Sequence, residues 1–407
     1  MKKRILIAIH YLELGGAEIS LIGLLQSIDY SKYEVDLFLW SHRGELMEFI
    51  PKEVHLLPEI PEYAQIERPL KDVVKSGFLR IAWRRFLTKI RFGRYKKSCH
   101  PIDGSAVLGY VADSVTPILP SLEQFGEYDL AISFLTPHNI VAEKVSAKKK
   151  VAWIHTDYSK IDVNADLELP VWSSYDYIAS ISDAVTDSFV KVFTQLRDRI
   201  IRIDNILSAE FVRKRSELIP TEEIEKEMPQ REGMTNLLSV GRFCAAKNYD
   251  NVPDICRRII EMGCPVTWYL IGYGGDEELI RRKIAEAGME KNVIILGKKS
   301  NPYPYIKACD IYVQPSRYEG NSVTVREAQM LCKPVIVTDY PTAKDQVKDG
   351  IDGVIVPMGN HGCAEGIIET VNNMALRDHL IEYTRASDFG NVQEIQNLYY
   401  LIEDDIV

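Results

Sequence analysis

The sequence predicts an α/β protein made of two doubly wound domains that face each other across a cleft. Short apolar runs alternate with helical patterns along most of the chain, which is typical of a parallel sheet covered by crossover helices. This alternating series occurs twice, once in each half of the chain. With 407 residues the chain is also long for a single hydrophobic core, so two domains of about 200 residues each are expected.

The N-terminal half contains strand patterns joined by helical ones. A tight turn at Gly15 and Gly16 follows the first strand, and residues 17–28 have the spacing of a helix with one apolar face. Residues 58–120 interrupt the alternation and are expected to be less regular. A helix from residue 192 is predicted to lead into the last strand. The strands are predicted at residues 4–9, 35–40, 129–134, 150–154, 177–181 and 199–203.

The C-terminal half repeats the alternation. Residues 220–232 are charged, with five glutamates, and are expected to be a linker or exposed loop. We place an N-terminal domain at 1–205, with an insertion at 68–100, and a C-terminal domain at 206–385. The last residues, 386–407, are predicted to contain a helix that returns to the N-terminal domain. The strands are predicted at residues 235–240, 266–271, 293–296, 311–313, 334–338 and 353–356.

Composition and charge exclude several classes of protein. The formal net charge of −9 argues against general nucleic-acid binding. The seven cysteines are scattered and form no C-x2-C pair, so we interpret them as reduced core residues rather than zinc ligands. The apolar run at residues 5–9 is too short for a signal peptide, and no run is long enough to cross a membrane. These features predict a cytoplasmic protein that would meet a membrane only from its surface.

The strongest chemical signal is a pair of glutamates, Glu319 and Glu327, separated by seven residues. Asn321 and Ser322 between them are typical of turns and helix N-caps, and Val323 begins a helical pattern. Glu319 should therefore lie just ahead of a helix, and Glu327 about two turns into it. Free amides at a helix start bind anions, and carboxylates bind sugar diols through charge-assisted hydrogen bonds. An ordinary exposed helix with two glutamates is the alternative.

A second cluster follows the strand predicted at residues 235–240. Gly241 comes directly after this strand, and Arg242 and Lys247 lie five residues apart on the next loop. Two cations at the carboxyl end of a strand are well placed to neutralise a diphosphate leaving group. A solvated basic loop is the alternative interpretation.

Two later strands also end in candidate ligand loops. Gly272 belongs to a glycine-rich turn, and Lys298 and Lys299 follow the next strand, where backbone groups could hold a nucleobase. Ligands of open α/β sheets bind at such carboxyl ends. A single glycine-rich turn most often only ends a strand. It indicates a ligand site here only together with the motifs around it.

Taken in order, these motifs resemble the retaining glycosyltransferases of family 4, also described as glycosyl transferases group 1. That family carries G-R-x4-K, G-x-G and E-x7-E in its C-terminal domain, and the similarity covers residues 236–358 closely. The resemblance implies the GT-B architecture, with two Rossmann-like domains around a central cleft. The N-terminal domain would bind the acceptor and the C-terminal domain the nucleotide sugar. Asn321 and Ser322 depart from the aromatic residue and glycine of many members, so the donor sugar cannot be transferred from them.

The N-terminal half resembles the family more loosely. Gly15 and Gly16 match the glycine-rich first loop, whose amides approach the donor phosphate. His155, followed by Asp157, matches a histidine near the reacting carbon, although a structural histidine is the alternative. Asn205 is similar to the asparagine that opens the interdomain connection, and a turn explains it equally well.

The resemblance implies a role for each residue. Arg242 and Lys247 would hold the diphosphate, Glu327 the ribose hydroxyls, and Glu319 the donor sugar. The predicted catalytic residues are His155, Arg242, Lys247 and Glu319. The residues predicted to bind the nucleotide sugar are Gly15, Gly16, Gly272, Lys298, Lys299, Asn321, Ser322, Val323 and Glu327.

The resemblance also implies a mechanism and substrates. Retention without a carboxylate nucleophile is expected to proceed by front-face substitution, in which the departing phosphate helps to deprotonate the acceptor. No D-x-D motif ends a strand, so we expect a hexosyltransferase that needs no metal and no cofactor. A uridine nucleotide sugar is preferred over a guanosine one as donor. The expected acceptor is a glycan or a lipid-linked sugar in envelope or capsular polysaccharide synthesis.

Other functions remain open at this point. A sugar-nucleotide epimerase on the same architecture is the main alternative, although E-x7-E and G-R-x4-K are less typical of it. A nicotinamide dehydrogenase is disfavoured because the turn at Gly15 lacks G-x-G-x-x-G spacing and no acidic residue ends the second strand. A binding protein that has kept the fold is the third alternative, against which the intact motif residues argue.

Residues 75–97 form a basic segment with nine Lys or Arg and no Asp or Glu. Apolar residues recur in it at helical spacing, and a basic amphipathic helix suits an anionic membrane surface. Packing of this apolar stripe on the N-terminal sheet is the alternative. We favour a peripheral protein at the inner face of the cell membrane, because the rest of the chain is acidic. The stripe comprises Phe78, Leu79, Ala82, Trp83, Phe86, Leu87 and Ile90.

Overall fold

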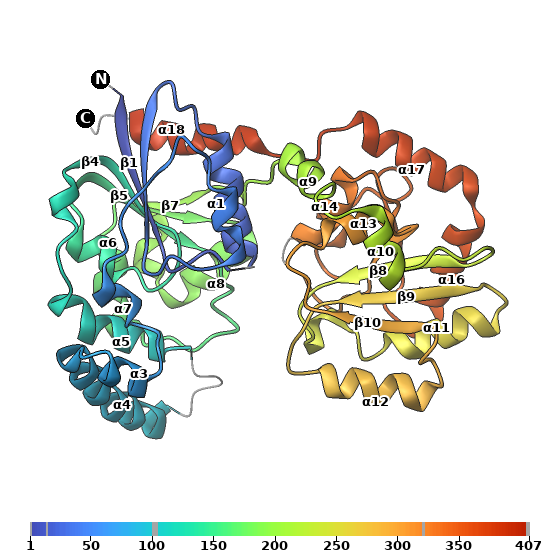
Figure 1. Ribbon diagram of the computed structural model, residues 1–407, viewed down its shortest axis with the longest axis horizontal. Helices are drawn as coiled ribbons and strands as arrows, with labels where there is room; N and C mark the ends of the chain where they lie inside the picture. Colours follow the sequence, from blue (N-terminus) through green and yellow to red (C-terminus); the bar gives the residue numbers. More distant parts are fainter. Residues whose placement is uncertain (1, 14, 100–104, 320–321, 404–407) are drawn as a thin grey trace. The chain divides into compact units, whose positions relative to one another are not determined.

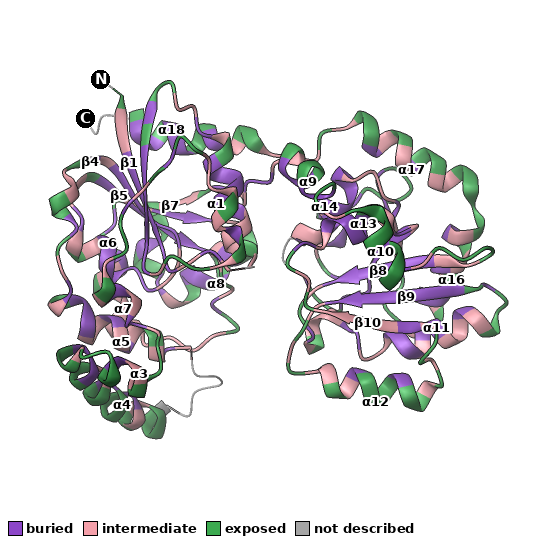
Figure 2. Cartoon of the chain, in the orientation of Figure 1, coloured by how far each residue is buried: buried purple, intermediate pink, exposed green. Residues whose placement is uncertain are grey.

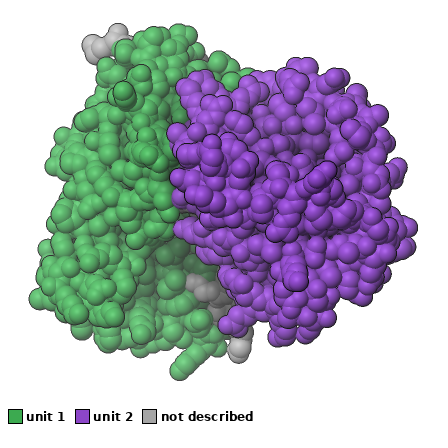
Figure 3. Space-filling view, turned by 45° about the vertical axis from the view of Figure 1, so that its right-hand side comes forward, with its two compact units in different colours: residues 1–207, 392–407 green, residues 208–391 purple. Residues whose placement is uncertain are grey.

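The computed structural model describes residues 2–13, 15–99, 105–319 and 322–403. The described chain divides into two compact units, which are drawn in Figure 1 and coloured separately in Figure 3. Unit 1 comprises residues 1–207 and 392–407, and unit 2 comprises residues 208–391. From the sequence we place these boundaries after residues 205 and 385.

In the described part of unit 1, seven parallel strands form a sheet in the order β3-β2-β1-β4-β5-β6-β7. The chain moves outward from β1 to β3, then returns to β4 and continues to β7. The winding therefore reverses between β1 and β4. The strands are β1 (Lys3–Ile9), β2 (Tyr33–Leu39), β3 (His55–Leu56), β4 (Tyr128–Ser133), β5 (Ala147–Ile154), β6 (Tyr177–Ser180) and β7 (Ile200–Arg202).

Helices cover both faces of this sheet, which explains why its central strands are buried apolar runs (Figure 2). A short 3-10 helix at Thr194–Arg199, rather than a longer helix from residue 192, precedes β7. The helices of unit 1 are α1 (Gly16–Ser27), α2 (Pro61–Ala64), α3 (Leu70–Lys75), α4 (Leu79–Cys99), α5 (Val107–Val115), α6 (Asn139–Lys144), α7 (Ala165–Ser173), α8 (Asp183–Val192) and α18 (Ile395–Glu403), and the other 3-10 segments are Glu45–Phe49, Thr116–Ile118, Glu123–Phe125 and Val392–Glu394.

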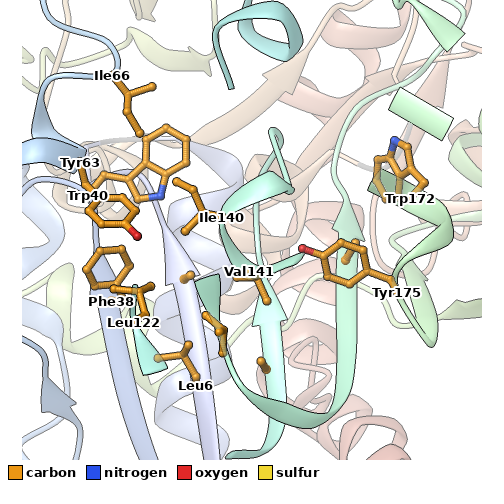
Figure 4. Packing of buried hydrophobic residues seen from close by; sticks show 14 of the residues in the cluster. Leu6, Phe38, Trp40, Tyr63, Ile66, Leu122, Ile140, Val141, Trp172 and Tyr175 are labelled. Carbon is orange, nitrogen blue, oxygen red and sulfur yellow. The ribbon is translucent and has the colours of Figure 1, made fainter. Parts of the chain in front are cut away.

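Residues 58–120 interrupt the alternation of strands and helices, as expected, but they are more regular than expected and contain more than the helix predicted in the basic segment. Helices α2 to α5 lie in this segment, because each buries a few residues against unit 1. Tyr63 of α2, Val73 of α3 and Ile81 of α4 are buried in its main hydrophobic cluster. Figure 4 shows Tyr63 beside Phe38 of β2, and their rings meet edge to face at 4.9 Å. Sparse anchors of this kind do not give a strong sequence pattern.

In the described part of unit 2, six parallel strands form a sheet in the order β10-β9-β8-β11-β12-β13. The winding reverses between β8 and β11, as it does between β1 and β4 in unit 1. Two doubly wound sheets were predicted, and the structure confirms that fold class. The strands are β8 (Thr235–Val240), β9 (Val266–Ile271), β10 (Val293–Gly297), β11 (Ile311–Gln314), β12 (Val335–Thr338) and β13 (Val354–Val356).

A linker or exposed loop was expected at residues 220–232. The structure instead places helix α10 within this charged segment. Ile224 and Met228 are buried, so two apolar residues attach an otherwise charged helix to unit 2. The helices of unit 2 are α9 (Ala209–Arg215), α10 (Thr221–Glu227), α11 (Val252–Glu261), α12 (Glu277–Ala287), α13 (Tyr303–Ala308), α14 (Val323–Met330), α15 (Ala343–Gln346), α16 (Asn360–Asn372) and α17 (Met374–Ala386), with a 3-10 turn at Ala245–Lys247.

The C-terminal helix α18 packs on unit 1. The ring of Tyr399 stacks on Tyr33 of β2 at 4.6 Å, and the Tyr33 hydroxyl donates to Glu403. Lys149 of β5 donates to the carbonyl of Leu401. These contacts attach the end of the chain to the first sheet. No helix in the described ranges is both long enough and apolar enough to cross a bilayer, and the cysteines whose side chains are described are free thiols.

Candidate functional site

The loops after β8 and β11 lie side by side at the point where the winding of unit 2 reverses. Ligands of open α/β sheets bind at such a switch point. Asn248 donates from its side chain to the Pro315 carbonyl at 2.9 Å, and Arg317 forms a two-bond ion pair with Asp250. These bonds connect the loop that carries Lys247 to the loop that carries Glu319.

The first of these loops presents two cations. Arg242 is exposed and makes no ion pair with any residue in the described ranges. The side chain of Lys247 passes over Gly241, where a β-carbon would lie 3.2 Å from its Cε. Its ammonium group ends 2.6 Å from Oε1 of Glu319. The two predicted phosphate-binding cations therefore belong to one loop, with one cation free and one paired.

Glycine is required at position 272, at the end of β9. A β-carbon on Gly272 would lie 1.9 Å from the carbonyl oxygen of Gly241, far inside van der Waals contact. Gly274 meets Phe243 in the same way, at 2.2 Å. The turn after β9 thus supports the Arg242 loop through direct backbone contact. Gly272 serves here as a packing residue, which leaves its predicted role in nucleotide binding untested.

Glu319 is held in place by an extended hydrogen-bond network. Its Oε1 accepts hydrogen bonds from Gln314 at 2.8 Å and Ser316 at 2.5 Å, besides the bond from Lys247. The residue is 8% exposed. Charge-assisted bonds from several donors fix a carboxylate in one orientation. Glu319 is therefore a rigid hydrogen-bond acceptor in the loop after β11.

Glu327 lies deeper, on α14, and is 2% exposed. The Tyr303 hydroxyl donates to its Oε1 at 2.6 Å. Burial raises the pKa of Glu327 to about 7, against the opposing effects of the Tyr303 bond and the positive charge of Arg215. The second oxygen of this carboxyl has no bond from Tyr303, so a ribose could meet Glu327 there.

The start of α14 is only partly described. Ser322 is buried, its amide donates to Oε1 of Gln346 at 3.0 Å, and its carbonyl accepts from the same side chain. Val323, the first residue of the helix, is half-buried. Asn321 lies outside the described residues. The amide of Ser322, predicted to meet phosphate or sugar, is thus occupied by Gln346 in this structure.

The two predicted base-binding lysines differ in their surroundings. Lys298 is exposed and lies over the ring of Tyr273 at 5.4 Å. Lys299 pairs with Glu227 of α10 at 2.5 Å and lies over Tyr305. Lys299 therefore has a partner that attaches α10 to unit 2, whereas Lys298 lies at the carboxyl end of β10 beside Tyr273.

The predicted residues of unit 1 follow β1 and β5. Gly15 is the N-cap of α1, and Gly16 is its exposed first residue. His155 packs 4.6 Å from the ring of Phe134, and burial lowers its pKa to about 3, although a hydrogen bond to Asn205 opposes this shift. His155 is therefore neutral at physiological pH. Such a ring can exchange hydrogen bonds with a ligand, but it cannot supply positive charge.

Sequence reasoning missed several residues of the unit 2 site. Gln314 and Ser316 orient Glu319, while Tyr303 and Arg215 surround Glu327. Gln314 is the last residue of the buried strand β11. A polar residue at the end of an apolar strand could have been recognised as a candidate site residue. No pattern in the sequence near Tyr303 or Arg215 indicates a contact with Glu327, because both residues lie on other helices than Glu327.

Comparison with known proteins gives one family match and several distant relatives. Residues 220–387 match the family described as "Glycosyl transferases group 1". A poly(ribitol-phosphate) alpha-N-acetylglucosaminyltransferase of Staphylococcus aureus is 24% identical over 37% of this chain and 29% of its own length. A lipopolysaccharide core biosynthesis glycosyltransferase of Rhizobium meliloti is 24% identical over 36% of this chain and 42% of its own length. The chain thus aligns with less than half of either relative.

Solved structures match over nearly the whole chain. HepE of Anabaena, in complex with UDP and glucose, superimposes with a TM-score of 0.66 at 15% identity, covering 99% of this chain and all of HepE. A TarM variant of S. aureus gives a TM-score of 0.66 at 12% identity, with the same coverage. At such identities the likeness establishes the fold. The chain therefore has the GT-B fold, and its residues 220–387 match the glycosyl transferases group 1 family.

Proposed function

We propose that this chain is a retaining glycosyltransferase. It would move a hexose from a nucleotide diphosphate sugar, preferably a uridine one, to a glycan or lipid-linked acceptor in envelope or capsular polysaccharide synthesis. The observation that carries the proposal is the Arg242–Lys247 loop, which ends beside Glu319 at the switch point of unit 2. This arrangement combines two cations for phosphate with a fixed carboxylate for sugar hydroxyls.

Arg242 and Lys247 would stabilise the departing diphosphate. Negative charge builds on the phosphate oxygens as the bond to the sugar carbon breaks, and two cations held in place offset that charge most in the transition state. This role needs no metal ion, and we propose a metal-independent reaction. The front face of the sugar would then receive the acceptor oxygen, whose proton passes to the departing phosphate.

Glu319 and Glu327 would divide the recognition of the donor. Three donors orient Oε1 of Glu319, so its carboxylate can accept hydrogen bonds from sugar hydroxyls without reorganising. Glu327 would accept from the ribose through the oxygen that Tyr303 does not occupy. The names of similar proteins support these substrates: HepE was solved with UDP, and a relative from Campylobacter jejuni is named as acting on a diphospho-undecaprenol acceptor.

A panel of nucleotide sugars tests the assignment. The chain should be stabilised against heat by UDP more than by GDP or ADP, and it should release UDP from at least one UDP-sugar. NMR of the product should show the anomeric configuration of the donor, and EDTA should leave the rate unchanged. Epimerised donor without release of nucleotide would contradict the proposal and support the epimerase instead. A product of inverted configuration would contradict the retaining mechanism.

We also propose that helix α4 binds an anionic membrane surface from the cytoplasmic side. Two apolar stripes run along this helix, and only one of them is used in packing. Ile81, Ala82 and Phe92 are buried against unit 1. The other stripe is exposed, with Trp83 60% accessible to solvent. That stripe comprises Leu79, Trp83, Phe86, Leu87 and Ile90, whose spacing places them on one side of a helix.

The basic residues of α4 lie on the flanks of the exposed stripe. Arg80 and Arg84 border it on one side and Lys89 on the other, by the geometry of an α-helix. An exposed aromatic stripe bordered by cations fits a bilayer interface, where each cation near an anionic surface contributes about 1 kcal/mol. Two residues of the stripe predicted from the sequence pack inside instead, since Ala82 is buried and Phe78 is half-buried against the main hydrophobic cluster.

Vesicle co-sedimentation tests the membrane proposal. The chain should bind vesicles containing phosphatidylserine at low salt, and it should bind neutral phosphatidylcholine vesicles much less. The double variant Trp83→Ser, Phe86→Ser should lose binding, whereas Met374→Ser, at an exposed apolar position of α17, should not. Equal binding of the double variant, or failure of the unmodified chain to bind either vesicle, would remove this proposal.

A further inference from the structure

Arg215, the last residue of α9, is a charged side chain in the interior of unit 2. It is 3% exposed. Its guanidinium lies over the ring of Phe211 at 5.5 Å and over the ring of Tyr303 at 5.4 Å. Burying a cation is costly unless its charge and its N–H groups find partners. The reaction proposed above gives this residue no role, so its burial requires another explanation.

Arg215 is attached to the loop that follows β10. Its Nη2 donates to the carbonyl of Ser300 at 2.9 Å, and its own carbonyl accepts from the side chain of Asn301 at 2.7 Å. Ser300 and Asn301 come directly after Lys298 and Lys299, in the loop predicted to hold the nucleobase. The guanidinium is therefore held from two sides, by this loop and by the rings that it covers.

The same guanidinium acts on Glu327. Helices α9, α13 and α14 pack on one another in unit 2 (Figure 1). Tyr303 of α13 contacts both charged residues, because its ring faces Arg215 and its hydroxyl donates to Oε1 of Glu327 at 2.6 Å. Burial raises the pKa of Glu327 to about 7, and the Tyr303 bond and the positive charge of Arg215 keep it from rising further.

The other elements that pack on α14 are β11, β12 and α17, and they leave this balance unchanged. β11 contributes Tyr312, which is neutral because burial raises its pKa. β12 contains no titratable residue. Among the described residues of α17, none shifts the pKa of Glu327. The titratable residues of that helix are Arg377, Asp378, His379, Glu382, Tyr383 and Arg385.

We propose that Arg215 is a positioning residue for the nucleotide: it touches no nucleotide atom, but it holds Glu327 as the anion that a ribose diol can bind. The inference rests on the proposed function, because it takes Glu327 as the group that meets the ribose. Since Tyr303 donates to Oε1, a proton on the carboxyl would occupy Oε2, the oxygen left for the ribose. Protonation of Glu327 therefore weakens nucleotide binding, and the charge of Arg215 opposes that protonation.

The pH dependence of UDP affinity tests this role. Arg215→Met removes the charge and keeps much of the side-chain volume. If it makes Glu327 about tenfold harder to ionise, the dissociation constant for UDP should rise about fivefold at pH 7 and less than about twofold at pH 9. Calorimetric titrations of the full chain measure both ratios, in which the titration of the UDP phosphates cancels. A loss of the same size at both pH values would indicate a structural role and overturn the proposal.

Matched variants isolate the charge of Arg215. Arg215→Lys keeps the positive charge and should retain most of the affinity at pH 7. Arg213→Met is the control, because Arg213 is an exposed residue of the same helix that donates to the carbonyl of Met330 on α14. Its ratio should stay near one at both pH values, and an equal pH-dependent loss there would contradict the assignment. Melting curves show which variants fold, and Arg215→Gln replaces Arg215→Met if the methionine variant does not.

A measurement without nucleotide separates this inference from the proposed function. Carbon-13 NMR of the side-chain carboxyl groups follows the titration of Glu327, whose signal is identified by its loss in Glu327→Gln. The midpoint should lie at higher pH in Arg215→Met than in the unmodified chain. That result without any binding of UDP would keep Arg215 as the group that ionises Glu327 and remove the proposed function. Binding of UDP with an unchanged midpoint would remove only the inference about Arg215.

Discussion

The two units have the same strand order around their switch points, yet the two crevices differ in charge. The crevice of unit 2, between β8 and β11, presents the cations Arg242 and Lys247 beside one fixed carboxylate. The crevice of unit 1, between β1 and β4, presents buried histidines and carboxyl groups such as Glu168. Topology places a binding site at the same point in both units, whereas the loops that follow the strands decide which ligand fits.

This comparison shows how one architecture can present two crevices of different charge. The cationic crevice suits a diphosphate, which needs charge neutralisation. The crevice of unit 1 has carboxyl groups and no Lys or Arg among its described lining residues, so it does not suit a diphosphate. The contrast can be tested by changing the groups on which it depends, in order of the expected effect.

The largest effect is expected from the cations of unit 2. Arg242→Ala or Lys247→Ala should reduce turnover roughly a hundredfold or more, because each is proposed to stabilise charge on the leaving group. Binding of uridine, which has no phosphates, should barely change in calorimetric titrations. Arg282→Ala, at an exposed position on α12, is the control. Equal losses of uridine and UDP binding would mean that the two residues are structural.

A smaller effect is expected at Glu327. Glu327→Ala would remove the proposed charge-assisted bonds to the ribose, each contributing roughly 1.5–3 kcal/mol, so the dissociation constant for UDP should rise at least about tenfold. Glu327→Gln, which can still accept from Tyr303, should lose less. The measurement is calorimetric titration with UDP, together with a melting curve for each variant. An unchanged dissociation constant in a folded Glu327→Ala would exclude the ribose contact.

The smallest effect concerns the buried carboxyl groups Glu327 and Glu168, one in each unit. Burial raises the pKa of each to about 7, well above the value in the unfolded chain. The folded chain therefore binds more protons, and the free energy of unfolding should fall as pH rises. Between pH 6 and pH 7 each group should contribute a loss of about 1 kcal/mol.

Urea titrations at the two pH values measure this loss. Glu168→Gln and Glu327→Gln should each reduce the difference between the two pH values, while Asp166→Asn, on the exposed side of α7, should leave it unchanged. An unfolding free energy that rises over this range because of either glutamate would mean that its carboxyl is stabilised as the anion in the folded chain.

Much of the fold was predictable because both sheets consist of buried apolar strands. The runs at Thr235–Val240 and Val266–Ile271 were placed to the residue, since nearly every residue of these two strands is buried in a sheet covered on both faces. Helix α10 was not predictable. Its surface is charged, and only the burial of Ile224 and Met228 against unit 2 makes it a stable element.

The site was predictable to a similar extent. The family resemblance implies that Arg242, Lys247 and Glu319 belong to one site, and the structure pairs Lys247 with Glu319 across 72 residues of chain. The groups that orient them were not visible. Tyr303 reaches Glu327 only because α13 and α14 pack together, and such packing leaves no trace in local sequence.

The sequence by itself determined the fold class, the positions of most strands along the chain and the chemical types of the motif residues, because these depend on local apolar patterns and on the residues that follow each strand. Tertiary structure decided which of several equivalent surfaces would be buried. Helix α4 has two apolar stripes, and only its contacts with unit 1 select Ile81 and Phe92 for the core and leave Trp83 exposed. The crevice of unit 1 is likewise a tertiary feature, since His10, His138 and Glu168 come from three separate segments. Burial depends on what lies opposite a residue in space, which no local pattern encodes.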